Sequence, residues 1–116
     1  MIREIQLQDI PGVNIGHAED LEAKTGVTVL AFPQGARAGV DISGGGPASR
    51  ETPVISPLTN DVPVNAIVLS GGSAYGLAAS DGVMACLEQR GMGYNTGFAK
   101  VPIVCQSCIY DLGYGS

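Results

Sequence analysis

The feature that most constrains the fold is an apolar strand that breaks at two glycines and continues into a helix. The run is NAIVLSGGSAYGL, residues 65–77. Its apolar core, residues 66–69, is short enough for a buried strand. Gly71 and Gly72 permit backbone conformations that a side chain would forbid, and Ser73 is placed to cap the following helix. The N-terminus of a helix that follows a strand through such a turn directs unpaired N–H groups above the strand, and these can bind an anion or an oxyanion.

The remaining pattern predicts an α/β protein that is rich in strands and has one long helix. We expect the helix at residues 73–90, where apolar residues recur at helical spacing and Gly91 follows as a stop. Strands are expected at residues 2–7, 13–17, 26–32, 38–42, 65–69 and 101–110. The strand at 38–42 is expected to return along 26–32 as a hairpin. Residues 48–64 hold three prolines and are expected to be irregular.

Length and charge exclude several classes of partner. The chain of 116 residues ends soon after an apolar strand, so we expect residues 1–116 to form a single incomplete domain, the beginning of a larger one. The net charge of −5 argues against nucleic acid and anionic membranes. No run is long enough to span a bilayer and no signal segment opens the chain, so we expect a cytoplasmic protein. One sheet face lacks cover, which favours homo-oligomers.

The cysteines do not predict a metal or redox site. Cys105 and Cys108 have CxxC spacing, but there is no second CxxC, and the only histidine, His17, is distant in sequence. In a strand, positions three apart face opposite sides of the sheet. Two buried, unpaired thiols are therefore favoured over a redox or metal site, and no metal or other cofactor is expected.

Two familiar site patterns are incomplete. A nucleophile elbow, G-x-S-x-G, needs a glycine where Tyr75 stands, and His17 precedes the serine instead of following it. A phosphate-binding loop needs Gly-Lys-Ser/Thr, which follows neither residues 44–46 nor residues 71–72. A tight turn with a helix cap is favoured over both, and His17 is expected to be structural.

Two other groups of polar side chains have alternative interpretations. Arg50 and Glu51 form either a solvated surface pair or, with Asp41, a network that pins the glycine-rich bend. Tyr110 ends an expected strand. Its phenol either donates a hydrogen bond to a substrate oxyanion or fills the edge of the core.

Three longer runs carry a more specific signal. They are GVDISGGGPASRET at residues 39–52, AIVLSGGSAYGLAASDGV at residues 66–83, and VPIV at residues 101–104 followed by IYDL at residues 109–112. In this order they closely resemble the N-terminal part of the DmpA-like L-aminopeptidase/D-esterase family. That family includes β-peptidyl aminopeptidases and nylon-oligomer hydrolases.

The resemblance implies part of a four-layer α/β/β/α sandwich and a precursor considerably longer than this chain. Such precursors cut themselves before a serine or threonine, which becomes an N-terminal nucleophile with its own amine as base. That nucleophile lies downstream of the matched part, so no catalytic residue is expected in this chain. The implied partners are a small peptide, amide or ester substrate and the remainder of the precursor, with no metal or organic cofactor.

The candidate substrate-binding residues are Gly71, Gly72 and Ser73 at the turn, together with Tyr110. The resemblance places Tyr110 near the substrate carbonyl. Two residues earlier, peptidase members carry a glutamate that receives the substrate amine, whereas this sequence has Cys108, which favours an amidase-like preference. The alternative is a stand-alone, non-catalytic module whose glycine loops bind a small molecule or phosphate through backbone amides.

Overall fold

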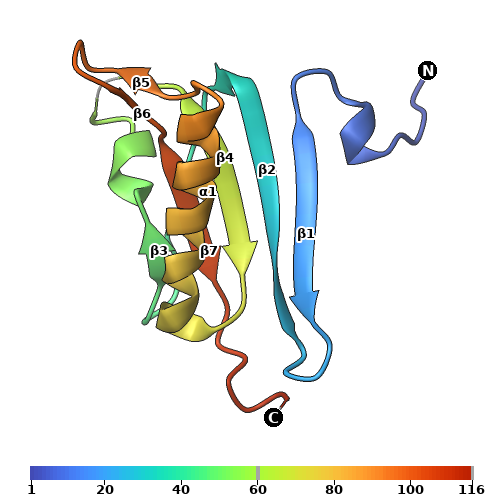
Figure 1. Cartoon of the computed structure of the whole chain (residues 1–116). Coiled ribbons are helices and arrows are strands. Elements are labelled where there is room, and N and C mark those ends of the chain that lie inside the picture. Colours follow the sequence, from blue (N-terminus) through green and yellow to red (C-terminus); the bar gives the residue numbers. More distant parts are fainter. Residues whose placement is uncertain (60, 116) are drawn as a thin grey trace.

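The computed structural model describes residues 1–59 and 61–115, in which one α-helix packs against a mixed five-stranded sheet (Figure 1). The sheet consists of β1 (Asn14–Asp20), β2 (Thr25–Ala36), β4 (Val64–Ser70), β7 (Val104–Cys108) and β3 (Ala48–Arg50), in that order across it. Strands β4 and β7 are parallel, and the other neighbours are antiparallel. The other elements are η1 (Leu7–Asp9), η2 (Thr52–Ile55), η3 (Ser73–Ala78), α1 (Ala79–Gln89), β5 (Tyr94–Asn95) and β6 (Lys100–Val101). The predicted α/β class is confirmed.

The core lies between α1 and the centre of the sheet. Ala66 and Val68 of β4 and Val104 of β7 are almost fully buried against Leu87 of α1. They share one face because side chains alternate along a strand and β4 and β7 are in register. A parallel pair needs a long crossover, which η3, α1 and the β5–β6 hairpin supply. The predicted central strand at 65–69 is therefore confirmed.

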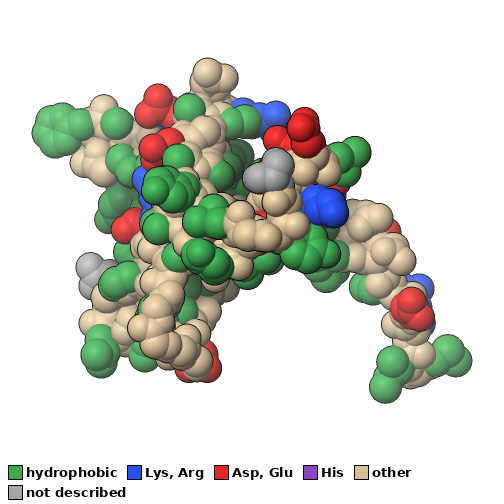
Figure 2. All heavy atoms as spheres, turned by 90° about the horizontal axis from the view of Figure 1, so that it is seen from below, with side chains coloured by type: hydrophobic (Ala, Val, Ile, Leu, Met, Phe, Trp, Pro, Cys, Tyr) green, Lys and Arg blue, Asp and Glu red, His purple; other side chains and the backbone are tan. Residues whose placement is uncertain are grey.

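The opposite face of the sheet is covered only in part. Val64, Ile103 and Cys105 form a second buried cluster, against which η2 and the chain on either side of it pack. Beyond this cluster the face is open, and Leu69 of β4 is 49% exposed. Viewed from below, the molecule is hollowed between the N-terminal segment and the lobe on the other side (Figure 2). Among the helices of residues 1–59 and 61–115, none has the length and apolar character that a bilayer crossing requires.

The prediction of two strands proves wrong. Residues 2–7 form no strand; the N-terminal segment projects from the edge of the sheet, and η1 follows (Figure 1). The side chain of Asp9 accepts a hydrogen bond from the N–H of Gln6, 3.0 Å away, which favours a local turn. Residues 38–42 form no hairpin with β2. Strand β2 continues to Ala36, and both of its edges are already paired, with β1 and β4.

Three other predictions need their bounds corrected. The helix over 73–90 is a 3₁₀ turn, η3, followed by α1, and Gly91 ends it with a φ of +71° as predicted. The strand over 101–110 is divided at Pro102, which has no N–H to donate, into β6 and β7. The stretch 48–64 is not wholly irregular, because β3 lies in it and pairs with β7.

Candidate functional site

The turn between β4 and η3 has two consecutive residues in the left-handed region. Gly72 has a φ of +90° and Ser73 a φ of +55°. Gly72, not Ser73, is the N-cap of η3, and no side chain caps this end. The predicted capping role of Ser73 is wrong because the residue lies inside the first turn, with a backbone unlike the extended conformation of an N-cap.

The amides of this turn donate to groups of the chain itself. The N–H of Gly71 donates to the carbonyl oxygen of Gly26 at 2.9 Å, and that of Ser73 donates to the carbonyl oxygen of Ile109 at 3.0 Å. Between them, the N–H of Gly72 donates to Oδ1 of Asp111 at 2.7 Å. The predicted seat for an anion therefore holds a carboxylate of the same chain.

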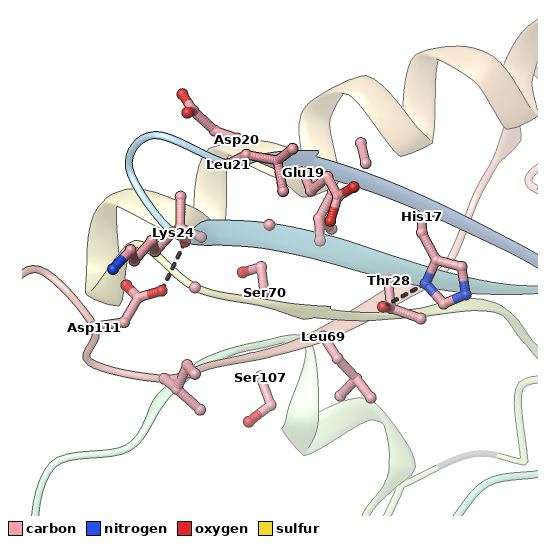
Figure 3. A pocket seen from close by; sticks show the side chains of 16 residues that line it. His17, Glu19, Asp20, Leu21, Lys24, Thr28, Leu69, Ser70, Ser107 and Asp111 are labelled. Carbon is pink, nitrogen blue, oxygen red and sulfur yellow. Dashed lines mark hydrogen bonds between the residues drawn. The ribbon is translucent and has the colours of Figure 1, made fainter. Parts of the chain in front are cut away.

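Asp111 accepts a second hydrogen bond from β2. The hydroxyl of Thr25 donates to its Oδ2 at 2.7 Å (Figure 3). The pKa of Asp111 lies below its usual value, first because of the Gly72 N–H and second because of the Thr25 hydroxyl, since both favour the charged form. Gly71 leaves room for this contact, because a Cβ there would overlap the carboxylate and the Thr25 hydroxyl.

The structure brings the two predicted substrate-binding segments together. The bonds to Ile109 and Asp111 place residues 109–111 directly beside the turn at 71–73. Tyr110 is 78% exposed, which contradicts the alternative that its ring fills the edge of the core. Its phenol is open to contact from outside the chain. Whether Tyr110, Gly71, Gly72 and Ser73 bind a substrate stays a prediction.

A buried polar network lies under η3, and sequence reasoning missed it. Gln106 of β7 is 2% exposed, and its Nε2 donates to the carbonyl oxygen of Gly76 at 2.6 Å and to Oγ of Ser70 at 2.8 Å. The buried hydroxyl of Ser80 donates to its Oε1. Cys108 borders the network, with its Sγ 3.2 Å from Oγ of Ser70. A glutamine within an apolar strand is the only sequence signal for this network.

A groove of about 820 Å³ runs along the open face, from the end that holds Asp111 to His17 (Figure 3). There, Nδ1 of His17 and Oγ1 of Thr28 are hydrogen-bonded across β1 and β2 at 2.8 Å. A histidine can activate a hydroxyl as a nucleophile when a third group orients the histidine ring and hydrogen-bond donors face the oxyanion that forms. Within residues 1–59 and 61–115 no further side-chain hydrogen bond reaches the His17 ring, and the amides of 71–73 are engaged elsewhere. The pair therefore acts as a cross-strand contact.

The cysteines face opposite sides of β7, as predicted. Cys105 is buried in the second cluster, and burial, followed by the charge of Glu51, raises the pKa of its thiol. Cys108 is half-buried, so the prediction of two buried thiols holds only for Cys105; both are free. Across residues 1–59 and 61–115 there is no group of three or more histidine, cysteine or acidic side chains that could hold a metal ion.

Arg50 contacts neither of its predicted partners. Its guanidinium donates to Oδ1 of Asp81 in α1 at 2.7 Å, and a second nitrogen contacts Sδ of Met84 at 3.2 Å. The predicted pairing with Glu51 or Asp41 is therefore wrong. Arg50 faces α1 because its position on β3 is in register with Gln106, which also points to that face. The contact ties β3 to the helix.

Known proteins resemble this chain over nearly all of its length. An uncharacterized aminopeptidase of Mycobacterium tuberculosis (strain ATCC 25618 / H37Rv) is 40% identical over 117 residues, covering 94% of this chain and 34% of the relative. A 6-aminohexanoate-oligomer endohydrolase of Agromyces sp. (strain KY5R) is 42% identical over 110 residues, covering 94% of this chain and 28% of the relative. An enzyme of the same name from Paenarthrobacter ureafaciens is 41% identical, with the same coverage.

The chain thus spans 28–34% of the length of these relatives. A family model described as Peptidase family S58 matches residues 6–116. The match includes all three runs on which the predicted family resemblance was based. This chain therefore belongs to Peptidase family S58.

Proposed function

We propose that this chain is the N-terminal part of an aminopeptidase or amidase that hydrolyses small peptide, amide or ester substrates. The observation that carries the proposal is the match of residues 6–116 to Peptidase family S58. The names of the relatives, aminopeptidase and 6-aminohexanoate-oligomer endohydrolase, support hydrolysis as the reaction class. Cys108 at the position of the peptidase glutamate favours amides without a free amine beside the scissile bond.

In this proposal the nucleophile comes from outside residues 1–116. Self-cleavage of a longer precursor exposes an N-terminal serine or threonine, whose own amine takes the proton from the hydroxyl. Tyr110 supplies the phenol that donates a hydrogen bond to the oxyanion of the tetrahedral intermediate. Gly71, Gly72 and Ser73 form the wall beside it, and the engaged amides of Gly72 and Ser73 hold residues 109–111 in place.

The open face of the sheet belongs to the same proposal. In a four-layer α/β/β/α sandwich, α1 and this sheet are two layers, and a second sheet from the remainder of the precursor covers the open face. The exposed Leu69 and the hollow on this side support such a neighbour. No metal or cofactor takes part. The site is proposed to lie in a cytoplasmic homo-oligomer.

The structure disfavours the alternative of a phosphate-binding module, because the backbone N–H groups of the turn at 71–73 are already hydrogen-bonded. A phosphate held by a glycine loop needs free backbone N–H groups that converge on it. Those of Gly71, Gly72 and Ser73 are engaged within the chain, and the carboxylate of Asp111 would repel an anion at this turn. Hydrolysis is the better-supported function.

The test compares the full-length product of the gene that encodes this chain with residues 1–116 alone. We expect the full-length product to yield two fragments by mass spectrometry and to hydrolyse 6-aminohexanoate oligomers in preference to aminoacyl-p-nitroanilides, whose free amine lies beside the scissile bond. Residues 1–116 alone are expected to give no turnover. Turnover by residues 1–116 that is lost in Thr28→Val would contradict the proposal, because it would place the nucleophile in the pair of Thr28 and His17. In the full-length product, Thr28→Val is expected to keep the wild-type kcat.

A further inference from the structure

We propose that Asp111 is a positioning residue that holds Tyr110 in place for the reaction. The proposal rests on the proposed function in one respect, namely that Tyr110 contacts the substrate. Its structural basis is independent of that function. It is the junction in which a single carboxylate joins the start of β2, the turn after β4 and the segment after β7.

Both oxygens of the carboxylate are used in this junction. Oδ1 accepts from the N–H of Gly72 and Oδ2 accepts from the hydroxyl of Thr25, each at 2.7 Å. Charged hydrogen bonds of this length are the stronger kind in proteins. Because both oxygens already accept strong bonds within the chain, we assign Asp111 to the support of a neighbour instead of to contact with a substrate.

That neighbour is Tyr110, whose backbone is fixed on both sides. Before it, the N–H of Ile109 donates to the carbonyl oxygen of Ser70 at 2.9 Å, and the carbonyl oxygen of Ile109 accepts from Ser73 at 3.0 Å. After it comes the Asp111 junction. Tyr110 is 78% exposed, so packing of its ring does little to fix the direction of the side chain. The position of the phenol therefore depends on the two neighbours.

The chain beyond Asp111 also folds back onto the turn between β1 and β2. The N–H of Tyr114 donates to the carbonyl oxygen of Asp111 at 3.0 Å. The ammonium of Lys24 lies 5.8 Å from the centroid of the Tyr114 ring, within the range of a cation–π contact. A Cβ at Gly115 would overlap the carbonyl oxygen of Ala23. The carboxylate of Asp111 is thus the first of several contacts that hold residues 111–115 against the turn between β1 and β2.

The identity of the acceptor gives a sharp prediction. An asparagine at position 111 can replace both bonds, because its amide oxygen accepts from Gly72 and its amide nitrogen donates to the hydroxyl of Thr25. An alanine can replace neither. If Asp111 acts through geometry, Asp111→Asn keeps the reaction and Asp111→Ala loses it. A residue that acts through its charge would lose the reaction in both variants.

The experiment measures kcat and KM of the full-length product for wild type, Asp111→Ala, Asp111→Asn, Tyr110→Phe and the double variant Tyr110→Phe/Asp111→Ala. We expect Asp111→Ala to lower kcat about 10- to 100-fold, as misplacement of a catalytic group does. Asp111→Asn is expected to restore most of the loss. In the Tyr110→Phe background, Asp111→Ala is expected to add little. Glu88→Ala removes an exposed carboxylate of α1 and serves as the matched control, with kcat unchanged.

Full additivity of the two substitutions, or an Asp111→Asn variant as slow as Asp111→Ala, would overturn the proposal. A second measurement separates it from the proposed function. With 3-fluorotyrosine at position 110, the ¹⁹F signal is expected to sharpen in Asp111→Ala and to change less in Thr25→Val, which loses one of the two bonds. An unchanged signal would contradict positioning even if the wild type hydrolyses nothing. Absent turnover in the wild type would contradict the proposed function alone.

Discussion

Gln106 shows how a single side chain can link the sheet to the helix layer. It lies in the middle of the shortest central strand, almost fully buried, and bonds to a carbonyl of η3 and to two serine hydroxyls. Buried polar groups are tolerated in a core only when their partners are present. The glutamine is therefore the centre of the network, and its loss takes away the partner of the Ser80 hydroxyl and of the Gly76 carbonyl oxygen.

We expect Gln106→Leu to destabilise the fold by about 2–3 kcal/mol, because the carbonyl oxygen of Gly76 and the hydroxyl of Ser80 lose their partner in a dry site. The matched control is Gln89→Leu at the exposed end of α1, which should change the free energy of unfolding by no more than about 0.5 kcal/mol. Urea unfolding of the two variants measures the difference. Equal stabilities would show that the network contributes nothing.

The lowered pKa of Asp111 makes stability depend on pH in a defined direction. The folded chain holds the carboxylate more strongly in its charged form than the unfolded chain does. Its contribution is complete above the usual pKa, near 3.8, and is lost as the pH falls through the lower pKa of the folded state. Thermal unfolding between about pH 6 and pH 2 should therefore show a steeper acid loss in wild type than in Asp111→Asn. Parallel curves for the two proteins would contradict this assignment.

At the scale of single residues, the sequence identified the turn at 71–73 but not the carboxylate of Asp111 that its amide binds. Gly71 and Gly72 were predicted from their position between a strand and a helix, and the structure explains both, one by close approach and one by a positive φ. Thr25 and Asp111 are 86 residues apart in sequence, so no local pattern could pair them. Ser73 has the side chain of a cap but lies one position too late to act as one.

At the scale of elements, the glycines of α1 allow a matched comparison. Gly82 lies within the helix, and a Cβ there would meet nothing within 4 Å, whereas Gly91 follows the helix with a φ of +71°. We expect Gly82→Ala to stabilise the fold by about 0.5–1 kcal/mol through helix propensity. Gly91→Ala should cost about 1–2 kcal/mol, because a Cβ is strained in the left-handed region.

Thermal or urea unfolding of these two variants gives the sign of each change directly. Shifts of the same sign would contradict the assignment of one glycine to the helix interior and the other to its end. The double variant should show the sum of the two effects, since the positions lie on different turns of the chain and share no contact among those described.

The two strands that were predicted wrongly depend on strand pairing, which the hydrophobic pattern of a sequence does not report. Alternation identified β2 and β4 correctly, because it reports which residues face a core. It does not report which edge of a strand is free. The hairpin expected from 38–42 needed an edge of β2 that β4 occupies. Residues 2–7 form no strand although β1 is an edge strand, because the hydrogen bond from Gln6 to Asp9 favours a local turn. The break of the last strand, by contrast, follows from Pro102 and was foreseeable.

At the scale of the whole molecule, one face of the sheet is covered by α1 and the other is largely open. Leu69 and Thr28 lie on the open face, where a sheet of this kind usually packs against a further layer. The sequence predicts a single long helix, and it was therefore possible to expect that only one face of the sheet would be covered. The groove did not, since it depends on how the turn at 71–73 and residues 109–111 meet.

We expect residues 1–116, prepared alone, to self-associate through this face. Leu69→Lys should lower the average mass measured by light scattering, because a charge within an apolar interface is costly to bury. Leu58→Lys, at an exposed turn after η2, is the control and should leave the mass unchanged. Equal masses for Leu69→Lys and wild type would show that the open face does not mediate the association.

The place of β7 has a consequence for how the protein is made. β7 lies between β4 and β3, both of which precede it in the chain, and β3 has no other partner in the sheet. While the ribosome is still translating residues before Val104, β1, β2 and β4 can already pair, but β3 cannot. The nascent chain therefore carries two unfinished strand edges until β7 emerges and fills the gap between them, an interval in which chaperone protection matters most.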